Sequence, residues 1–517
     1  RRKSAASDIS KTRSPKSTEV TASRDYDVVV VGAGPVGLVA ALLLAKQGIS
    51  VLLLEKERSM FPLPRAAHID HEIMRIFQSI NVAEEVASSS EVSTRYEFLN
   101  VSGDVLMRFD TGRAHALSGW PPSNMIHQPS IEQILRARVA ACDFVDARFG
   151  AAYRDHKSSG DVVTVHFDTQ GKTSKMSCRF LIGCDGANSA VRANAGMSLV
   201  DLGFSERWLV IDTKVIDSSR LPQHNLQICD PERPTTSVRM GAGRHRWEFM
   251  LKAEENEDEV SAPASVANLL SGWDVDGAVE LERTATYTFE AKVANQWMHD
   301  GVVIAGDAAH LMPPFAGQGL CSGIRDVENL TWKLGAILAG RADKSLLSSY
   351  QTEREPHVRA MIDLAVMMGK VVCVTDPEAA LARDKNLIET RRANGDASGA
   401  IPNPKLVTGL LQENSQIAGE LFPQFTHQKK RSDDVFGPGA WLIGESDGID
   451  RNTLRAAGIG VPSLASFSDL VSQWLDDKGY SSVLIRPDRV IFGGGNAAEL
   501  VSVYVEGLCG EVRATTR

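Results

Sequence analysis

The residues of this chain that are best suited to chemistry are glycines and carboxylates in three separated segments. A GxGxxG pattern begins at Gly32, Asp185 lies in a Cys-Asp-Gly sequence, and Asp307 follows Gly306 much later in the chain. Glycines let backbone N–H groups approach a phosphate, and carboxylates accept hydrogen bonds from sugar hydroxyls. Three such segments in this order predict a site for a nucleotide cofactor.

The first segment has the features of a phosphate-binding turn. Gly32 permits a tight turn after a strand, Gly34 lets the backbone approach a pyrophosphate, and Gly37 allows close packing of helix on sheet. Pro35 and Val36 begin the helix, whose N-terminus offers partial positive charge to the phosphates.

Carboxylates are also expected at two strand ends. Glu55, followed by Lys56, ends the strand after this helix, where it can accept hydrogen bonds from an adenosine ribose. Gly306 and Asp307 follow four apolar residues, and Asp307 can hold ribityl hydroxyls or simply cap the next turn.

A helix N-terminus after the third segment suits a reduced, anionic isoalloxazine, because its free N–H groups can face negative charge. Together the three segments predict bound FAD. The residues expected along this loop and first helical turn are Pro314, Gly317, Gly319 and Leu320.

The elements that must position these residues follow from hydrophobic periodicity. A strand, a helix and a second strand form a βαβ unit, two further buried strands precede Asp185 and Gly306, and a long helix follows Gly319. Their expected ranges are 28–31, 36–47, 50–54, 180–182, 302–305 and 319–338.

The three segments match, in order, the fingerprints of a known family. The chain resembles the single-component, class A FAD-dependent aromatic hydroxylases over roughly residues 25–375. Within that family it is similar to the 3-(3-hydroxyphenyl)propionate hydroxylases and to related phenol and polyketide hydroxylases. The segments that carry this similarity are 64–72, 118–129 and 201–210.

The resemblance implies roles for particular residues. Arg65 and Gln128 would contact the phosphate and ribityl chain of non-covalently bound FAD, Glu55 the ribose, Asp307 the ribityl chain, and Asp185 the pyrophosphate side. NADH or NADPH would bind transiently, because no second nucleotide-binding fingerprint occurs in the chain.

The activity implied is hydroxylation of a phenol, ortho to its hydroxyl, by a flavin hydroperoxide, with NAD(P)H and O₂ consumed. A substrate like 3-(3-hydroxyphenyl)propionate is the leading expectation. His68 and Asp70 are candidate proton acceptors, although a histidine in a loop is often only solvated. Arg207 and Trp208 are candidates for contact with the substrate, or a surface arginine beside a packed tryptophan, and Pro314 is expected to line the reacting face of the flavin.

The expected fold class is mixed α/β. A Rossmann-like FAD-binding domain is interleaved with a β-sheet substrate domain and followed by a thioredoxin-like C-terminal domain. The expected ranges are 1–24 for a basic, disordered tail, 25–200 and 293–390 for the FAD-binding domain and its helices, 201–292 for the mostly β substrate domain, 391–435 for a linker, and 436–517 for the C-terminal domain.

Composition excludes several other classes of function. A net charge of −9 argues against nucleic acid as a partner. The apolar run 28–45 contains a Gly-Ala-Gly-Pro sequence that would break a membrane helix. Seven cysteines without a CxxC pair favour a reducing, cytoplasmic location and no metal site. The basic tail is interpreted as a disordered segment or an expression remnant, with a transit peptide as the alternative.

Two other functions remain open at this point. A reductase or dehydrogenase of the same fold would bind FAD in the same way without forming a stable hydroperoxide, and a flavin-binding protein without catalysis is a further alternative. The C-terminal module has no CxxC pair, so we expect it to mediate a homodimer contact or to stabilise the fold.

Overall fold

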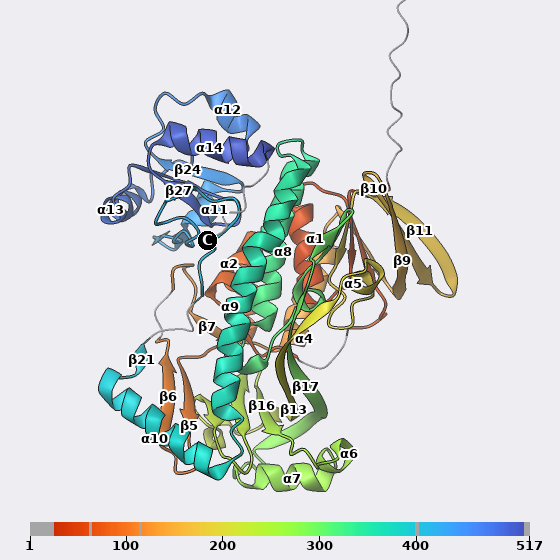
Figure 1. The fold of residues 1–517 in the computed structure, drawn as a ribbon, viewed down its shortest axis with the longest axis vertical. Helices are drawn as coiled ribbons and strands as arrows, with labels where there is room; N and C mark the ends of the chain where they lie inside the picture. The colour runs from red at the N-terminus through yellow and green to blue at the C-terminus, as the bar shows by residue number, and fades with distance from the viewer. Residues whose placement is uncertain (1–24, 61–64, 113–115, 399–402, 511–517) are drawn as a thin grey trace, which may run out of the picture.

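The computed structural model describes residues 25–60, 65–112, 116–398 and 403–510. A central α/β part lies above a sheet-rich part and beside a small α/β part formed by the C-terminal residues (Figure 1). The predicted tail, residues 1–24, lies outside the described residues. The predicted fold class is confirmed, because helices and sheets are interleaved along the chain as expected.

The central part contains the predicted strand, helix and strand as β1 (Val28–Val31), α1 (Pro35–Ala45) and β2 (Val51–Glu55). The two strands pair in parallel, and their apolar side chains are buried, as parallel sheets require. The sheet has the order β18-β19-β12-β1-β2-β8. Its other strands are β8 (Val145–Phe149), β12 (Phe180–Gly183), β18 (Met298–His299) and β19 (Val302–Ile304).

Helix α8 (Gly319–Leu338) packs against α1 and has the predicted bounds. Gly323 makes close packing possible, since a Cβ there would lie 2.8 Å from the side chain of Val36. Helix α9 (Ser348–Val372) runs beside α8 (Figure 1). None of the described helices is both long and apolar enough to cross a membrane. The other helices here are α2 (His71–Ser79), α3 (Ala83–Ser89), α4 (Gln128–Ala140) and α5 (Ala190–Asn194).

The second large sheet has nine strands in the order β20-β17-β13-β16-β15-β14-β5-β6-β21. The long strands β13 (Leu199–Val215) and β17 (Val279–Ala294) pair antiparallel and connect it to the central part. The remaining elements are β14 (Asn225–Ile228), β15 (Thr235–Met240), β16 (Arg244–Met250), β20 (His310–Leu311), β21 (Ala397–Ser398), α6 (Glu257–Val260), α7 (Pro263–Ser271) and α10 (Pro377–Asn394).

Two strands of this sheet come from the segment expected in the FAD-binding domain. They are β5 (Arg95–Leu99) and β6 (Val105–Asp110), and they extend the sheet because β5 pairs in parallel with β14. The nine-stranded sheet therefore draws on four separate stretches of chain, because β20 and β21 also lie outside the segment 199–294.

Two smaller sheets complete the central part. One has the order β3-β7-β4, and its register places His68 opposite Met125. Its strands are β3 (His68–Asp70), β4 (Glu91–Val92) and β7 (Ser123–Met125). The other consists of β9 (Ala151–Ser159), β10 (Val162–Thr169) and β11 (Lys172–Cys178).

The C-terminal part is a mixed four-stranded sheet, β25-β24-β26-β27, with helices around it, as expected for a thioredoxin-like domain. The strands are β24 (Ala440–Gly444), β25 (Ile459–Gly460), β26 (Ser482–Ile485) and β27 (Ile491–Gly494). The other elements are β22 (Thr426–His427), β23 (Lys430–Arg431), α11 (Ser432–Phe436), α12 (Arg451–Ala456), α13 (Ser468–Lys478) and α14 (Ala497–Cys509).

A buried charge network joins this domain to the central helices. Glu353 of α9 accepts hydrogen bonds from Lys333 of α8 at 2.8 Å and from Arg486 at 2.7 Å, and all three side chains are fully buried. The ion pairs lower the pKa of Glu353 despite the opposing effect of burial. The C-terminal domain is therefore held to the helix whose N-terminus begins at Gly319.

The segment expected as a linker, 391–435, is packed in its described parts. It begins inside α10, and Leu410 joins the main core while Phe422 joins the core of the C-terminal domain. Prolines broke the helical pattern there, but they did not prevent burial of the apolar residues between them.

Candidate cofactor and substrate site

A cavity of about 430 Å³ lies between the central α/β part and the nine-stranded sheet. Most of the residues singled out from the sequence line it. They are Gly34, Pro35, Val36, Arg65, His68, Asp70, Gln128, Asp307, Pro314, Gly317, Gly319 and Leu320.

The glycines of the first segment divide into two kinds. Gly32 has φ +100°, and a Cβ there would lie 2.4 Å from the carbonyl oxygen of Cys184. A Cβ on Gly37 would lie 1.9 Å from the Gly32 carbonyl oxygen. Gly34 differs, because a Cβ there would meet no atom within 4 Å and the residue lines the cavity. Gly32 and Gly37 are thus required for packing, whereas Gly34 keeps the cavity open.

Glu55 stabilises the glycine-rich turn that follows β1. Its carboxylate accepts hydrogen bonds from the backbone N–H of Ala33 at 2.7 Å and of Glu57 at 2.9 Å. Lys56 is exposed, and neither Glu55 nor Lys56 is part of the cavity wall. Contact of Glu55 with a ribose stays a prediction.

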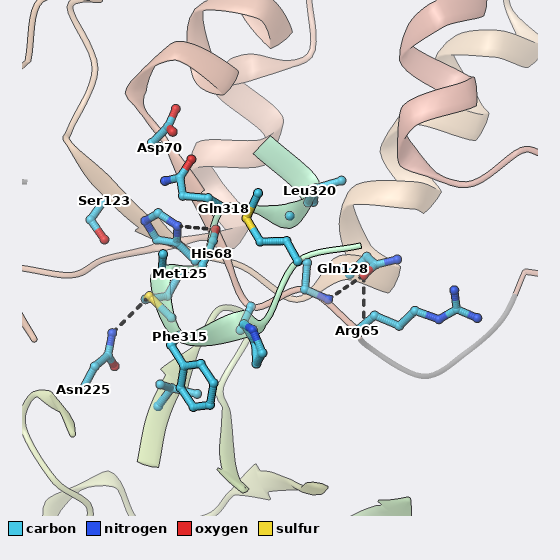
Figure 2. A pocket seen from close by; sticks show the side chains of 18 of the residues that line it. Arg65, His68, Asp70, Ser123, Met125, Gln128, Asn225, Phe315, Gln318 and Leu320 are labelled. Atoms are coloured by element: carbon cyan, nitrogen blue, oxygen red, sulfur yellow. Dashed lines mark hydrogen bonds between the residues drawn. The ribbon is translucent and has the colours of Figure 1, made fainter. Parts of the chain in front are cut away.

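Arg65 and Gln128 lie side by side in one region of the cavity (Figure 2). The side-chain oxygen of Gln128 accepts hydrogen bonds from the backbone N–H of Arg65 at 3.2 Å and of Ala66 at 2.7 Å. Its amide nitrogen donates to Glu132 at 2.8 Å, which fixes the orientation of the amide. Gln128 therefore positions the loop that carries Arg65.

Asp185 stabilises the beginning of the short helix α5, whose N-cap is Ser189. Its carboxylate accepts hydrogen bonds from the Ser189 hydroxyl and from the backbone N–H of Val191 at 3.1 Å. Asp185 is absent from the described cavity wall, but its neighbours Cys184 and Gly186 belong to it.

Asp307 faces the cavity. Its side chain is accessible from the cavity and surrounded by protein on its other sides, and this burial raises its pKa. Among the described residues, none donates a hydrogen bond to its carboxylate. A carboxylate in this position has acceptor capacity for the hydroxyls of a ligand.

The loop before α8 provides another part of the wall. Gly317 has the left-handed φ of +63°, which a side chain would strain, and its carbonyl faces His68. A Cβ on Gly319 would meet nothing within 4 Å. The first N–H groups of α8 have no partner within the helix. Gly306, which lies next to Val36, donates its N–H to the buried Asp326 at 3.2 Å.

These features fit FAD. The backbone at Gly34 and Gly319 is open to the cavity, Asp307 presents an unused acceptor to it, and the N-terminus of α8 faces it. Phosphates and an anionic ring are the groups that helix N-termini favour, and sugar hydroxyls suit a carboxylate.

His68 lies where the loop before α8 approaches the nine-stranded sheet (Figure 2). Its Nδ1 is 3.1 Å from the carbonyl oxygen of Gly317. Burial lowers the pKa of His68, so the ring is neutral at pH 7. Because a carbonyl only accepts, Nδ1 carries the proton and Nε2 has the free lone pair.

Asp70 is committed to structure. It caps α2 by accepting the N–H of Glu72 at 3.0 Å and forms a buried ion pair with Arg325. Burial favours the protonated form, but Arg325 and the neighbouring histidines lower the pKa of Asp70 far below its usual value. A carboxylate with so low a pKa is a weak base, which favours His68 over Asp70 as a proton acceptor.

Arg207 and Trp208 do not reach the cavity. Arg207 donates to the carbonyls of Lys252 at 2.9 Å and Ala253 at 3.2 Å, on the outer side of the sheet. Trp208 is fully buried, and its ring packs edge-on against Phe315 with centroids 5.7 Å apart. Neither residue therefore lines the cavity. Trp208 instead supports Phe315, which does line it.

Sequence reasoning missed the side chains that the nine-stranded sheet directs into the cavity. Tyr96 accepts a hydrogen bond from Gln227 at 2.7 Å and donates one to the carbonyl of Phe315 at 3.3 Å. Burial raises the pKa of Tyr96, so it stays neutral. Other residues of this sheet that line the cavity include Phe109, Val210, Asn225, Thr236, Val238, Arg246, Glu248, Tyr287 and Phe289. Alternation along the strands could have indicated their face but not their partners.

Comparison with known proteins gives the family. A family model described as FAD binding domain matches residues 25–365. A relative in Rhodococcus jostii (strain RHA1), named "Probable NADH-specific resorcinol 4-hydroxylase", is 36% identical and covers 93% of this chain and 94% of its own. A "3-(3-hydroxy-phenyl)propionate/3-hydroxycinnamic acid hydroxylase" of Mycobacterium sp. (strain JLS) is 37% identical over 91% of this chain and 89% of its own.

Solved structures share the fold. The flavin-dependent monooxygenase PieE, in complex with FAD and substrate, has a TM-score of 0.79 at 21% identity and covers 94% of this chain and 100% of its own. Aklavinone-11 hydroxylase, with FAD and aklavinone, has a TM-score of 0.76 at 22% identity and covers 94% and 99%. Both relatives align with most of the chain and are named as hydroxylases. Their names favour a hydroxylase over a reductase or a flavin-binding protein without catalysis. The chain belongs to the family of FAD-dependent aromatic-ring monooxygenases.

Proposed function

We propose that this monooxygenase hydroxylates a small phenol with a meta substituent, ortho to the existing hydroxyl, and that it uses NADH. Two relatives support the substrate class, because resorcinol and 3-(3-hydroxyphenyl)propionate, which their names contain, are both meta-substituted phenols. The name of the first relative also supports NADH as the reductant. A homodimer and a cytoplasmic location stay predictions.

The observation that carries the proposal is the position of Tyr96. Its hydroxyl joins Gln227 of the substrate sheet to the carbonyl of Phe315, in the loop that precedes α8. A phenol bound beside these groups would lie between the sheet and the cofactor loop, and hydroxyl and amide groups suit recognition of a phenolic hydroxyl.

The cofactor is proposed to lie along the opposite wall. The open backbone at Gly34 and the N-terminus of α8 would face its negatively charged groups, and Asp307 would accept hydrogen bonds from its ribityl hydroxyls. The residues proposed to line this part of the site are Gly34, Pro35, Val36, Arg65, Gln128, Asp307, Pro314, Gly317, Gly319 and Leu320, with Gly32, Gly37, Glu55, Asp185 and Gly306 supporting them.

FAD, when bound, accepts a hydride from NADH and activates dioxygen. One oxygen atom replaces a ring hydrogen and the other leaves as water, so NADH and a proton balance the reaction. The chain must orient the ring, exclude water and remove the phenolic proton. We assign the last role to His68, whose neutral ring has its Nε2 lone pair free to accept the proton.

The test is NADH and NADPH oxidation by the FAD-loaded protein with a panel of meta-substituted phenols, together with oxygen uptake and product identification. We expect phenol-stimulated NADH oxidation and a catechol or hydroxyquinol product with the new hydroxyl ortho to the original one. A new hydroxyl at another position would contradict the regiochemistry, and oxidation that no phenol stimulates would contradict the substrate class.

A further inference from the structure

The turn that carries Asp307 is held by buried side chains outside the cavity wall. It follows β19 and consists of a short 3₁₀ helix, Gly306–Ala308, and the strand β20. Asp307 lines the cavity, and its carboxylate accepts no hydrogen bond from a described residue. The direction of this carboxylate therefore depends on how the backbone on either side of it is held.

Asp326 of α8 is the centre of this support, and its side chain is fully buried. One of its carboxylate oxygens accepts hydrogen bonds from the backbone N–H of Gly306 at 3.2 Å and from Nε2 of His310 at 2.6 Å. These two donors lie on either side of Asp307 in the chain. The other oxygen accepts a hydrogen bond from Nε of Arg354, on α9, at 2.9 Å. Asp326 therefore joins both sides of the turn to the helices α8 and α9.

The charge of Asp326 is matched to these partners. Burial alone would raise the pKa of Asp326, but His310 and Arg354 lower it below its ordinary value, so the side chain is a carboxylate at pH 7. A carboxylate only accepts hydrogen bonds, so Nε2 of His310 carries a proton. Asp326 thus meets three donors, and an amide in its place would set its own donor against at least one of them.

Two further side chains hold the same segment by its carbonyl groups. Tyr350 of α9 donates its hydroxyl to the carbonyl of Ile304 at 2.9 Å. Arg192 of α5 donates to the carbonyl of Ala308 at 3.0 Å and to that of Ala187, in the second glycine-bearing segment, at 2.8 Å. None of the supporting side chains belongs to the described cavity wall, so they act on the cavity through the backbone of the turn.

We propose that Asp326 and His310 are positioning residues for FAD, because they direct Asp307 into the cavity before the cofactor binds. This inference rests on the proposed function, in which Asp307 binds the ribityl chain. A protein whose binding-competent conformation is populated only in part binds its ligand more weakly in proportion. A turn that keeps its native geometry for about a tenth of the time would therefore raise Kd for FAD about 10-fold.

The experiment measures the FAD affinity of the His310→Leu, His310→Gln and Asp326→Asn apoproteins by flavin fluorescence, at a temperature at which thermal unfolding shows each of them to be folded. The amide of glutamine keeps a donor for Asp326, whereas leucine does not. We expect His310→Leu to raise Kd for FAD about 10-fold or more, and His310→Gln to raise it less than about 3-fold. Asp326→Asn should raise Kd at least as much as His310→Leu.

Glu353→Gln is the matched control for Asp326→Asn. Glu353 is also a fully buried carboxylate that pairs with an arginine, but its partner Arg486 belongs to the C-terminal domain and not to the turn. Both substitutions should lower the thermal stability of the apoprotein, because each leaves a buried cation without a carboxylate partner. Only Asp326→Asn should raise Kd for FAD. If Asp326→Asn does not fold, the two His310 variants decide the question.

Three results would overturn the inference. They are wild-type FAD affinity in His310→Leu, an equal loss of affinity in His310→Gln and His310→Leu, or an equal increase of Kd in Glu353→Gln and Asp326→Asn. Asp307→Ala separates the inference from the proposed function, because it removes the proposed contact itself. Unchanged FAD affinity in Asp307→Ala would refute the placement of the cofactor, whereas a raised Kd there with wild-type affinity in His310→Leu would refute only the positioning role.

Discussion

Replacing Gly34 with alanine should separate cofactor binding from folding. Gly34 has φ −71° and ψ 177°, which alanine adopts without strain, and a Cβ there meets no protein atom within 4 Å. Alanine is a poorer N-cap than glycine, but it also reduces the entropy of the unfolded chain, and each effect is worth about 0.5–1 kcal/mol. The two effects oppose each other, so the apoprotein should keep its stability.

The same methyl group would occupy space that FAD needs. It projects into the cavity where the open backbone is proposed to meet the pyrophosphate. Loss of one hydrogen bond to a charged group costs about 1.5–3 kcal/mol, which raises Kd by roughly 10- to 150-fold. Thermal unfolding of the apoprotein and FAD titration by flavin fluorescence measure the two quantities separately.

Two other glycines provide controls. Gly272, which follows α7, also has an ordinary φ of −67° and open space at Cβ, but it does not line the cavity. Gly272→Ala should therefore change neither the stability of the apoprotein nor its affinity for FAD substantially. Gly37→Ala should destabilise the fold itself, because its Cβ would lie 1.9 Å from a backbone oxygen. A Gly34→Ala protein that folds normally and binds FAD with wild-type affinity would refute the reasoning.

Three further substitutions test the proton acceptor and the buried charges. His68→Asn should lower kcat about 100-fold at pH 7 while FAD affinity stays the same, and loss of FAD binding instead would identify a structural role. Glu353→Ala leaves Lys333 buried without a carboxylate and Arg486 with only Asp488, so thermal unfolding should show a loss of about 3–5 kcal/mol, and a loss below about 1 kcal/mol would contradict this account. Burial and nearby carboxylates raise the pKa of Glu328 to about 8 from its ordinary 4.5, so the folded state binds this proton more tightly and stability falls as pH rises between these values. Between pH 5.5 and pH 8.5 the free energy of unfolding of Glu328→Gln should therefore change less than that of the wild type. An equal change in both proteins would refute the assignment.

Local signals in the sequence predicted the cofactor half of the molecule well. The glycines near residue 32 specify a turn that few other residues permit, and the apolar runs before Gly183 and Ala305 have the length of buried parallel strands. Helix α8 has the predicted bounds because glycine marks its beginning and its apolar residues recur at helical spacing.

The substrate half could not be predicted in the same way. Tyr96 and Gln227 meet only because β5 joins β14 in a parallel pair, although more than a hundred residues separate them in the chain. Alternation reveals which residues share a face of a strand, but not which strands become neighbours. For Arg207 the sequence suggested a contact with the substrate, because the residue lies beside a tryptophan in a segment shared with the family. The strand instead directs its side chain toward a surface loop.

The most direct test of the central claim is hydroxylation under isotopically labelled dioxygen. The FAD-loaded protein is supplied with NADH and 3-(3-hydroxyphenyl)propionate, and the product is analysed by mass spectrometry. We predict one labelled oxygen atom per product molecule, in the new hydroxyl on the aromatic ring, and one NADH consumed for each product molecule formed. A ring hydroxyl that carries oxygen from water, or NADH oxidation that yields only hydrogen peroxide with every phenol, would contradict the assignment as an aromatic-ring monooxygenase.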